Sequence, residues 1–268
     1  MLINMGITMN TSMNITKTTE TTAKSYSQDE QELRVDLAAA CRLMHHYGMS
    51  DMIYGDASLR INADPPRFLM NPYGTIFNEV RASNLVTVDV NGNKLNPGDA
   101  DINPSAFNVN NALHLKRSDA NVILHTHSVN GMAVAAMEEG LLPLNQISME
   151  FYNRTAYFDY KGIPFDIAER ERMFASIGQK KFLIMRHHGL LTVGRTIAEA
   201  FYYMYYLDKA CEIQVKALST GAKLSIPSPE ICEYVARQYE AATCDREILD
   251  TWNANLRLLD RLDPSYRE

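Results

Sequence analysis

The sequence predicts an α/β fold in which a largely antiparallel sheet carries helices on its faces. Apolar runs of strand length alternate with longer segments of helical periodicity along most of the chain. Two short turns, Asn91-Gly92 and the segment around His188-Gly189, each lie between two strand-like runs, as in antiparallel hairpins. Because there is no internal repeat and no long linker, we expect one domain over residues 27–268, preceded by a disordered segment over residues 1–26.

The first ordered element is expected at Ser27, because Ser27-Gln28-Asp29-Glu30 has the S-x-x-E form of a capping box. Apolar residues then recur at helical spacing, which predicts a helix that ends near Gly48. Strand-like segments follow at residues 57–61, 67–70 and 85–90. The tight-turn dipeptide Asn91-Gly92 comes directly after them, so this region is expected to be antiparallel.

Helices and strands alternate through the rest of the chain. The pattern predicts helices at residues 105–117, 129–139 and 167–177, and strands at residues 122–127 and 156–160. Two short strands are expected within residues 182–193, on either side of His188. The longest helix is expected at residues 196–219, and two further helices follow Pro227 and Pro229.

Composition narrows the classes of function. The net charge of −6 comes without any block of Lys or Arg, which argues against nucleic acid and anionic membranes as partners. No apolar stretch approaches the roughly 18 residues of a membrane span, and the first 26 residues lack the features of a signal peptide. The four cysteines show no paired spacing, so we expect reduced thiols and a cytoplasmic location: Cys41, Cys211, Cys232 and Cys244.

Three histidines predict a divalent metal site. His125 and His127 end an apolar strand, and residues i and i+2 of a strand share one face, so both imidazoles can reach one ion while Thr126 points away. His188 follows a second apolar run and precedes Gly189, which begins a turn. Three histidine ligands leave coordination positions open for water or substrate, a pattern typical of catalytic metal sites.

The motifs together resemble the class II aldolase/adducin family, on its adducin-like side. The matching segments are GDASLR (55–60), LMNPYGTIF (69–77), SDANVILHTHS (118–128), EEGLLPL (138–144), AYFDYKGI (156–163) and the stretch 186–218. The resemblance implies an α/β/α sandwich around a mixed, mostly antiparallel sheet. It also implies a homotetramer with sites between subunits, and one divalent metal per subunit held by His125, His127 and His188, with zinc as the expected ion and manganese or iron as alternatives.

One departure from the family concerns proton transfer. The sugar-phosphate aldolases carry a glutamate acid/base at the position that Ala106 occupies in Asn103-Pro104-Ser105-Ala106. Alanine cannot transfer protons, so another group would be needed. The carboxylates considered are Asp99, Asp101 and Glu150, with Glu150 as the carboxylate candidate and His114 as a possible proton shuttle. The alternative for His114 is a buried histidine bonded to a backbone carbonyl.

A second departure concerns the phosphate site that the resemblance implies. The family's G-N-x-S turn is Gly55-Asp56-Ala57-Ser58 in this chain, and its T-x-T-G element is Asn71-Pro72-Tyr73-Gly74. An ionised Asp56 would repel a phosphate that carries about −1.5 to −2 charges. We therefore expect a non-phosphorylated hydroxy-acid, keto-acid or aromatic acid as substrate. The expected substrate-binding residues are Asp56, Asn71, Tyr73, Gly74 and Ser105.

Three functions follow as hypotheses. The first is a metal-dependent lyase for aldol cleavage or decarboxylation, in which the metal acts as a Lewis acid. The second is a mononuclear non-haem Fe(II) oxygenase, which Fe(II)-dependent oxygen consumption would identify. The third is a non-catalytic assembly module like adducin, which the alanine at position 106 favours and the three retained histidines oppose.

Overall fold

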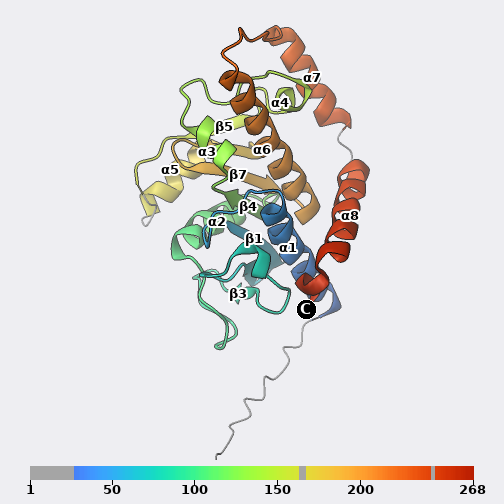
Figure 1. Cartoon of the computed structure of the whole chain (residues 1–268). Coiled ribbons are helices and arrows are strands. Elements are labelled where there is room, and N and C mark those ends of the chain that lie inside the picture. Colours follow the sequence, from blue (N-terminus) through green and yellow to red (C-terminus); the bar gives the residue numbers. More distant parts are fainter. Residues whose placement is uncertain (1–26, 163–166, 243–244) are drawn as a thin grey trace, which may run out of the picture.

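A seven-stranded mixed sheet organises the molecule (Figure 1). The computed structural model describes residues 27–162, 167–242 and 245–268, so the disordered segment predicted at residues 1–26 lies outside the described residues, as does Cys244. The strand order is β3-β2-β1-β4-β7-β6-β5. Every neighbouring pair is antiparallel except β5 and β6, which are parallel. The strands are β1 (Asp56–Ala63), β2 (Pro66–Met70), β3 (Val86–Val88), β4 (Val122–Thr126), β5 (Thr155–Phe158), β6 (Phe182–Met185) and β7 (Gly189–Gly194).

Helices cover both faces of this sheet (Figure 1). On one face α1 and α6 pack against the strands with α8 beside them, while α2 and α5 pack on the other. Helices α3 and α4 pack against α6, and α7 packs against α4. The fold is therefore the α/β/α sandwich that the family resemblance implied. The helices are α1 (Gln28–His46), α2 (Pro104–Lys116), α3 (Val129–Ala135), α4 (Gln146–Glu150), α5 (Ile167–Ile177), α6 (Ile197–Ser219), α7 (Pro229–Ala242) and α8 (Asp245–Leu262).

Side-chain caps fix where the principal helices begin. The Ser27 side chain accepts a hydrogen bond from the backbone N of Glu30 at 3.2 Å, as the capping box predicted, whereas the Glu30 carboxylate accepts from Arg34. Asn103 caps α2 through the backbone N of Ser105, and Thr196 caps α6 through the backbone N of Glu199. Each such cap satisfies an amide that the helix itself leaves without a partner.

The alternation of side chains along β4 determines which layer holds the site. Val122 and Leu124 belong to the apolar cluster shared with α1 and α6, while Ile123 belongs to the cluster shared with α2 and α5. Thr126 follows the first set, and its hydroxyl contacts Met204 of α6. Because side chains alternate along a strand, His125 lies on the same face as Ile123, toward α2 and α5.

Most predicted elements are present, with four differences. The strand predicted at residues 156–160 spans Thr155–Phe158 instead. The helix predicted at residues 129–139 ends at Ala135, and the chain continues in turns to Gly140, which has φ of 68°. The strand predicted at residues 85–90 is limited to Val86–Val88. Helix α4 was not predicted, because its five residues are too few to show a helical period. None of the helices in the described parts of the chain is both long and apolar enough to cross a membrane.

Candidate metal centre

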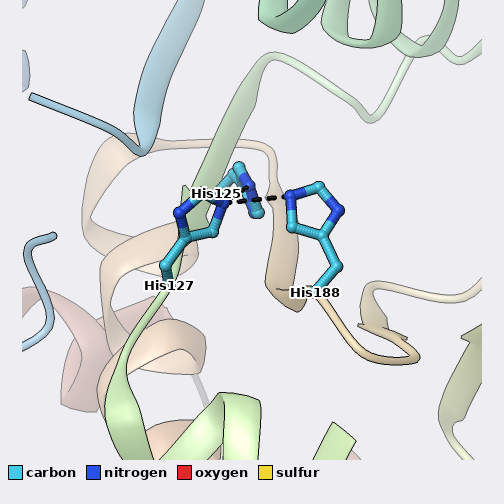
Figure 2. Close-up of side chains that lie close together, drawn as sticks. All are labelled: His125, His127 and His188. Atoms are coloured by element: carbon cyan, nitrogen blue, oxygen red, sulfur yellow. Dashed lines mark hydrogen bonds between the residues drawn. The ribbon is translucent and has the colours of Figure 1, made fainter. Parts of the chain in front are cut away.

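The three histidines predicted as metal ligands converge at one end of the sheet (Figure 2). His127 Nε2 lies 3.0 Å from His125 Nε2 and 3.0 Å from His188 Nε2. One ligand nitrogen from each residue lies within 4.8 Å of the others. Ligand nitrogens about 2.0–2.1 Å from a tetrahedral zinc ion are separated by little more than 3 Å, so the spacing fits one small divalent cation.

Strand pairing brings the three residues together. His125 lies opposite Leu191 in the antiparallel β4–β7 pair, and His127 follows the last residue of β4. His188 occupies the turn between β6 and β7, so the end of β4 and this turn meet. Gly189 is essential to this approach, because a Cβ at that position would stand 2.3 Å from the backbone oxygen of Thr126.

Hydrogen bonds at the other ring nitrogens determine which atom each imidazole presents. His125 Nδ1 donates to the carbonyl of Leu190 at 2.8 Å, and His127 Nδ1 donates to Asp51 Oδ2 at 3.1 Å. A neutral imidazole with a proton on Nδ1 presents a lone pair at Nε2. Two such lone pairs therefore face each other, and a cation bound between them would relieve this repulsion. Burial is the main reason that the pKa of His125 is lowered and that of His188 is lowered to about 4, which keeps both rings neutral.

The histidines form one wall of a cavity of about 640 Å³. Three tyrosines line it, and its remaining wall combines apolar side chains with carboxyl, amide and hydroxyl groups. Among the described residues, no Lys or Arg lines this cavity. The lining residues outside the histidines are Asp51, Tyr54, Gly55, Asp56, Tyr73, Asn103, Pro104, Ser105, Ala106, Val109, Asn110, Tyr160, Met173, Met185 and Leu191.

The structure separates the five predicted substrate-binding residues into two groups. Asp56, Tyr73 and Ser105 line the cavity beside the histidines, whereas Asn71 and Gly74 are not part of its lining. Asn71 is buried and has a structural role, because its side-chain oxygen accepts a hydrogen bond from the backbone N of Ala57 at 2.9 Å. Ala106 also lines the cavity, so the position of the family's glutamate faces the histidines as the resemblance implied.

Asp56 places a carboxyl group in the same cavity. It is opposite His125 in the β1–β4 pair, on the same face of the sheet. Its Oδ1 accepts a hydrogen bond from Asn110 Nδ2 at 2.5 Å, and burial raises its pKa to about 7. A carboxyl group with this pKa can hold or release a proton near neutral pH.

This cavity lining contains none of the four residues considered for proton transfer, which are Asp99, Asp101, Glu150 and His114. The His114 ring stacks on Phe68, donates from Nδ1 to the carbonyl of Ala120 at 2.6 Å, and accepts from Ser58 Oγ at 2.8 Å, so both ring nitrogens are in use. Burial lowers its pKa to about 4. Glu150 lies on α4 and lines a different cavity with Tyr203 and Tyr239, where burial raises its pKa to about 8.

Several cavity residues were missed by sequence reasoning. Asp51 and Tyr54 lie in the loop before β1, and Tyr160 follows β5 with its ring 5.5 Å from that of His188. Their only sequence signal is proximity to matching segments, since Tyr54 precedes GDASLR directly and Tyr160 lies within AYFDYKGI. No sequence pattern indicated that Asn110 belongs to the site, because its partner Asp56 is 54 residues away in sequence.

Comparison with known proteins agrees with this fold. Residues 35–215 match the family described as "Class II Aldolase and Adducin N-terminal domain", and the chain therefore belongs to the class II aldolase and adducin family. Class II aldolases depend on a divalent metal, typically zinc, and the three-histidine group is of a kind that could hold one.

Individual relatives come from both branches of the family. The "Putative aldolase class 2 protein" of Caulobacter vibrioides is 43% identical over 242 residues, which cover 90% of this chain and 94% of that protein. Alpha-adducin of Rattus norvegicus is 38% identical over 222 residues, which cover 82% of this chain and 30% of adducin. The crystal structure of an aldolase II superfamily protein from Pseudomonas syringae has a TM-score of 0.86 at 40% identity, covering 91% of this chain and 98% of that one.

Proposed function

We propose that this protein is a divalent-metal-dependent lyase that cleaves or decarboxylates a small, non-phosphorylated hydroxy- or keto-acid. The observation that carries the proposal is the convergence of three Nε2 atoms on a cavity without a described Lys or Arg in its lining. Three protein ligands leave open positions at which a substrate can bind. Zinc is the ion we propose, one per subunit, with manganese or iron as alternatives.

The residues of such a site would have different roles. His125, His127 and His188 would hold the ion, which when bound supplies Lewis-acid polarisation of the substrate oxygens. Asp56 would hold or release a proton at its carboxyl group, a task that Ala106 cannot perform. Asn110 keeps that carboxyl group in place through its side-chain amide.

The charge of the cavity supports a substrate without phosphate. Phosphate sites in proteins are rich in Arg, Lys and backbone amides. This cavity presents instead two carboxyl groups, Asp51 and Asp56, and no Lys or Arg among its described residues. A substrate whose single acid group binds at the metal fits this charge distribution better than a phosphate ester does.

The aromatic and apolar part of the cavity lining supports an apolar or aromatic substituent on that acid. Tyr54, Tyr73 and Tyr160 bring three rings to the lining, and Met173 and Leu191 add apolar surface. Aromatic rings pack well against other rings and against methionine. An aromatic hydroxy- or keto-acid is therefore among the substrates to test first.

A second function, a non-catalytic assembly module, is favoured by two observations. Alpha-adducin shares 38% identity with this chain over 222 residues, and the acid/base position holds Ala106. The three converging histidines oppose this function, because an assembly role gives no reason to bring three imidazoles together.

Elemental analysis of protein purified without chelator would test the proposal. We expect close to one zinc or manganese per chain in the wild type, and loss of the metal in His125→Ala/His127→Ala. The control is His46→Ala, which removes an exposed histidine on α1 and should keep the metal. Metal-loaded protein would then be assayed with hydroxy- and keto-acids. Iron as the bound metal would direct the assays to oxygen consumption, and a wild type that binds no added metal would leave the assembly module as the better explanation.

We further propose that the protein acts in the cytoplasm as a homotetramer with its sites at subunit contacts. Apolar side chains remain exposed at and near the cavity, among them Tyr54, Tyr73 and Tyr160 in its lining and Val129 and Met132 on α3, which begins two residues after His127. Such a surface is suited to a contact with another subunit.

A further inference from the structure

We infer that Asp51 is a positioning residue of the metal centre, whose carboxylate holds His127 in the tautomer and orientation that present Nε2 to a divalent cation. The inference rests on the proposed function, because it assigns a role within the same centre. Asp51 did not stand out in the sequence, and no motif of the metal site includes it. Its role follows from the contact that it makes in the folded chain.

The contact of Asp51 with His127 is specific. Asp51 Oδ2 lies 3.1 Å from His127 Nδ1. An ionised carboxylate only accepts hydrogen bonds, so the proton lies on Nδ1 and the Nε2 atom carries the lone pair. His127 is the histidine whose Nε2 lies 3.0 Å from both of the others. A rotation or a change of tautomer at His127 would therefore disrupt both of these approaches.

The loop that carries Asp51 is folded tightly around this contact. The backbone N of Tyr54 donates to the carbonyl of Asp51 at 2.8 Å, which closes a turn over residues 51–54. Within this turn Met52 has φ of 45°, in the left-handed region that residues other than glycine rarely adopt. The Met52 side chain is 73% exposed, so packing of that side chain does not explain the strain. Strained backbone of this kind concentrates at functional sites, and here it accompanies the placement of Asp51 beside His127.

Electrostatics gives Asp51 a second effect on the same ligand. Histidine ligands of metals commonly donate their second N–H to a carboxylate or a carbonyl, which raises ligand basicity, and loss of such a partner lowers metal affinity 10–100-fold. His125 has a carbonyl partner in Leu190, whereas His127 has the charged partner Asp51. With Ala106 at the family's carboxylate position, Asp51 adds a carboxylate next to a centre built from three imidazoles.

Metal titration of matched variants tests this role. Apo-protein would be titrated with Co²⁺, followed by its visible absorption, and with Zn²⁺ in competition. We expect Asp51→Ala to bind both ions roughly 10–100-fold more weakly, with an altered Co²⁺ spectrum. Asp51→Asn keeps a hydrogen-bond acceptor without the charge and should recover part of the affinity. The control is Asp101→Ala, which removes an exposed carboxylate paired with Lys94 and should bind like the wild type.

The tautomer of His127 can be measured without any metal. In the apo wild type, ¹⁵N NMR of the histidine rings should show His127 protonated at Nδ1, and Asp51→Ala should show a mixture of tautomers. The role of Asp51 is overturned if Asp51→Ala binds Co²⁺ within twofold of the wild type with the same spectrum. It is also overturned if Asp101→Ala weakens binding as much, since charge at a distance then explains the effect.

These outcomes are distinguishable from failure of the proposed function. A wild type that binds no metal overturns the lyase, while the tautomer measurement in apo-protein still decides whether Asp51 positions His127. If Asp51→Ala does not fold, Asp51→Asn answers the same question, because a Co²⁺ affinity and spectrum identical to those of the wild type would exclude a role for the charged partner.

Discussion

Asp56 and Ala106 line the same cavity from opposite elements, one from β1 and the other from α2. In the sugar-phosphate aldolases that the chain resembles, the carboxylate belongs to the helix and an amide occupies the strand position. This chain has the carboxyl group on the strand, next to the helical amide of Asn110. The exchange changes the charge at the position expected to hold a phosphate, and this gives a direct prediction.

Asp56→Asn should increase affinity for inorganic phosphate. At pH 8 an ionised Asp56 repels the anion, and an amide removes that repulsion while it adds a hydrogen-bond donor. We expect a gain of roughly tenfold, equivalent to about 1.4 kcal/mol, measured by isothermal titration calorimetry on the metal-loaded protein. Asp101→Asn removes an exposed carboxylate outside the cavity lining and should leave the affinity unchanged. Equal phosphate binding by the wild type and Asp56→Asn would show that Asp56 does not control anion selection.

His114 should make the protein less stable in mild acid. Its pKa in the folded protein is about 4, against an ordinary value of 6.5, because burial disfavours the charged ring. Below pH 6.5, His114 becomes protonated in the unfolded chain but stays neutral in the folded chain down to about pH 4. The free energy of unfolding therefore decreases as the pH falls from 6.5 toward 4. For this group the loss between pH 7 and pH 5 is about 2 kcal/mol.

Urea unfolding of the wild type and His114→Gln at pH 7 and pH 5 would measure this contribution. The variant should lose less stability than the wild type over that interval, and the contributions of other buried groups cancel in the comparison. The same pH dependence in both proteins would mean that His114 does not account for the acid sensitivity.

At the scale of elements, the close approach of β4 and β7 sets the position of the histidines. A Cβ at Gly189 would meet the backbone oxygen of Thr126 at 2.3 Å and approach the His125 and His127 rings at 3.3 Å and 3.2 Å. Backbone atoms cannot rotate away as a side chain can, so the two elements must separate.

Gly189→Ala should therefore destabilise the fold by about 1–3 kcal/mol, the usual cost of overpacking, and weaken metal binding as well. Gly98→Ala is the matched control, since a Cβ there meets nothing within 4 Å. Thermal unfolding and Zn²⁺ titration of both variants would check the prediction. A Gly189→Ala protein with wild-type stability and metal affinity would contradict it.

The same elements show what sequence patterns could and could not predict. Helix α5 is at the predicted residues 167–177, because its apolar residues recur at helical spacing and Gly178 follows it. The two segments that carry the converging histidines were predictable for a similar reason, since each of them adjoins an apolar strand. The contacts of Asp51 with His127 and of Asn110 with Asp56 were not predictable, because they join residues 76 and 54 positions apart, and only folding places such residues side by side.

The surface around the cavity differs from the rest of the site in being apolar and exposed. Val129 is 74% exposed and Met132 is 36% exposed, both on the short helix that follows His127. In a monomer these side chains stay exposed to water and contribute no hydrophobic stabilisation. In the tetramer that we propose, a neighbouring subunit covers them and completes the wall of the cavity.

Sedimentation equilibrium should give a mass near four times the 30.3 kDa of one chain. Val129→Glu should dissociate this assembly, because it places a charge at a desolvated contact, while an exposed site in a monomer would tolerate it within about 0.5 kcal/mol. Ile231→Glu is the matched control, since Ile231 is 51% exposed on α7 and outside the cavity lining, and this variant should leave the tetramer intact. A wild type that sediments as a single chain would exclude sites shared between subunits. The metal and its substrate would then have to be bound by residues of one chain alone.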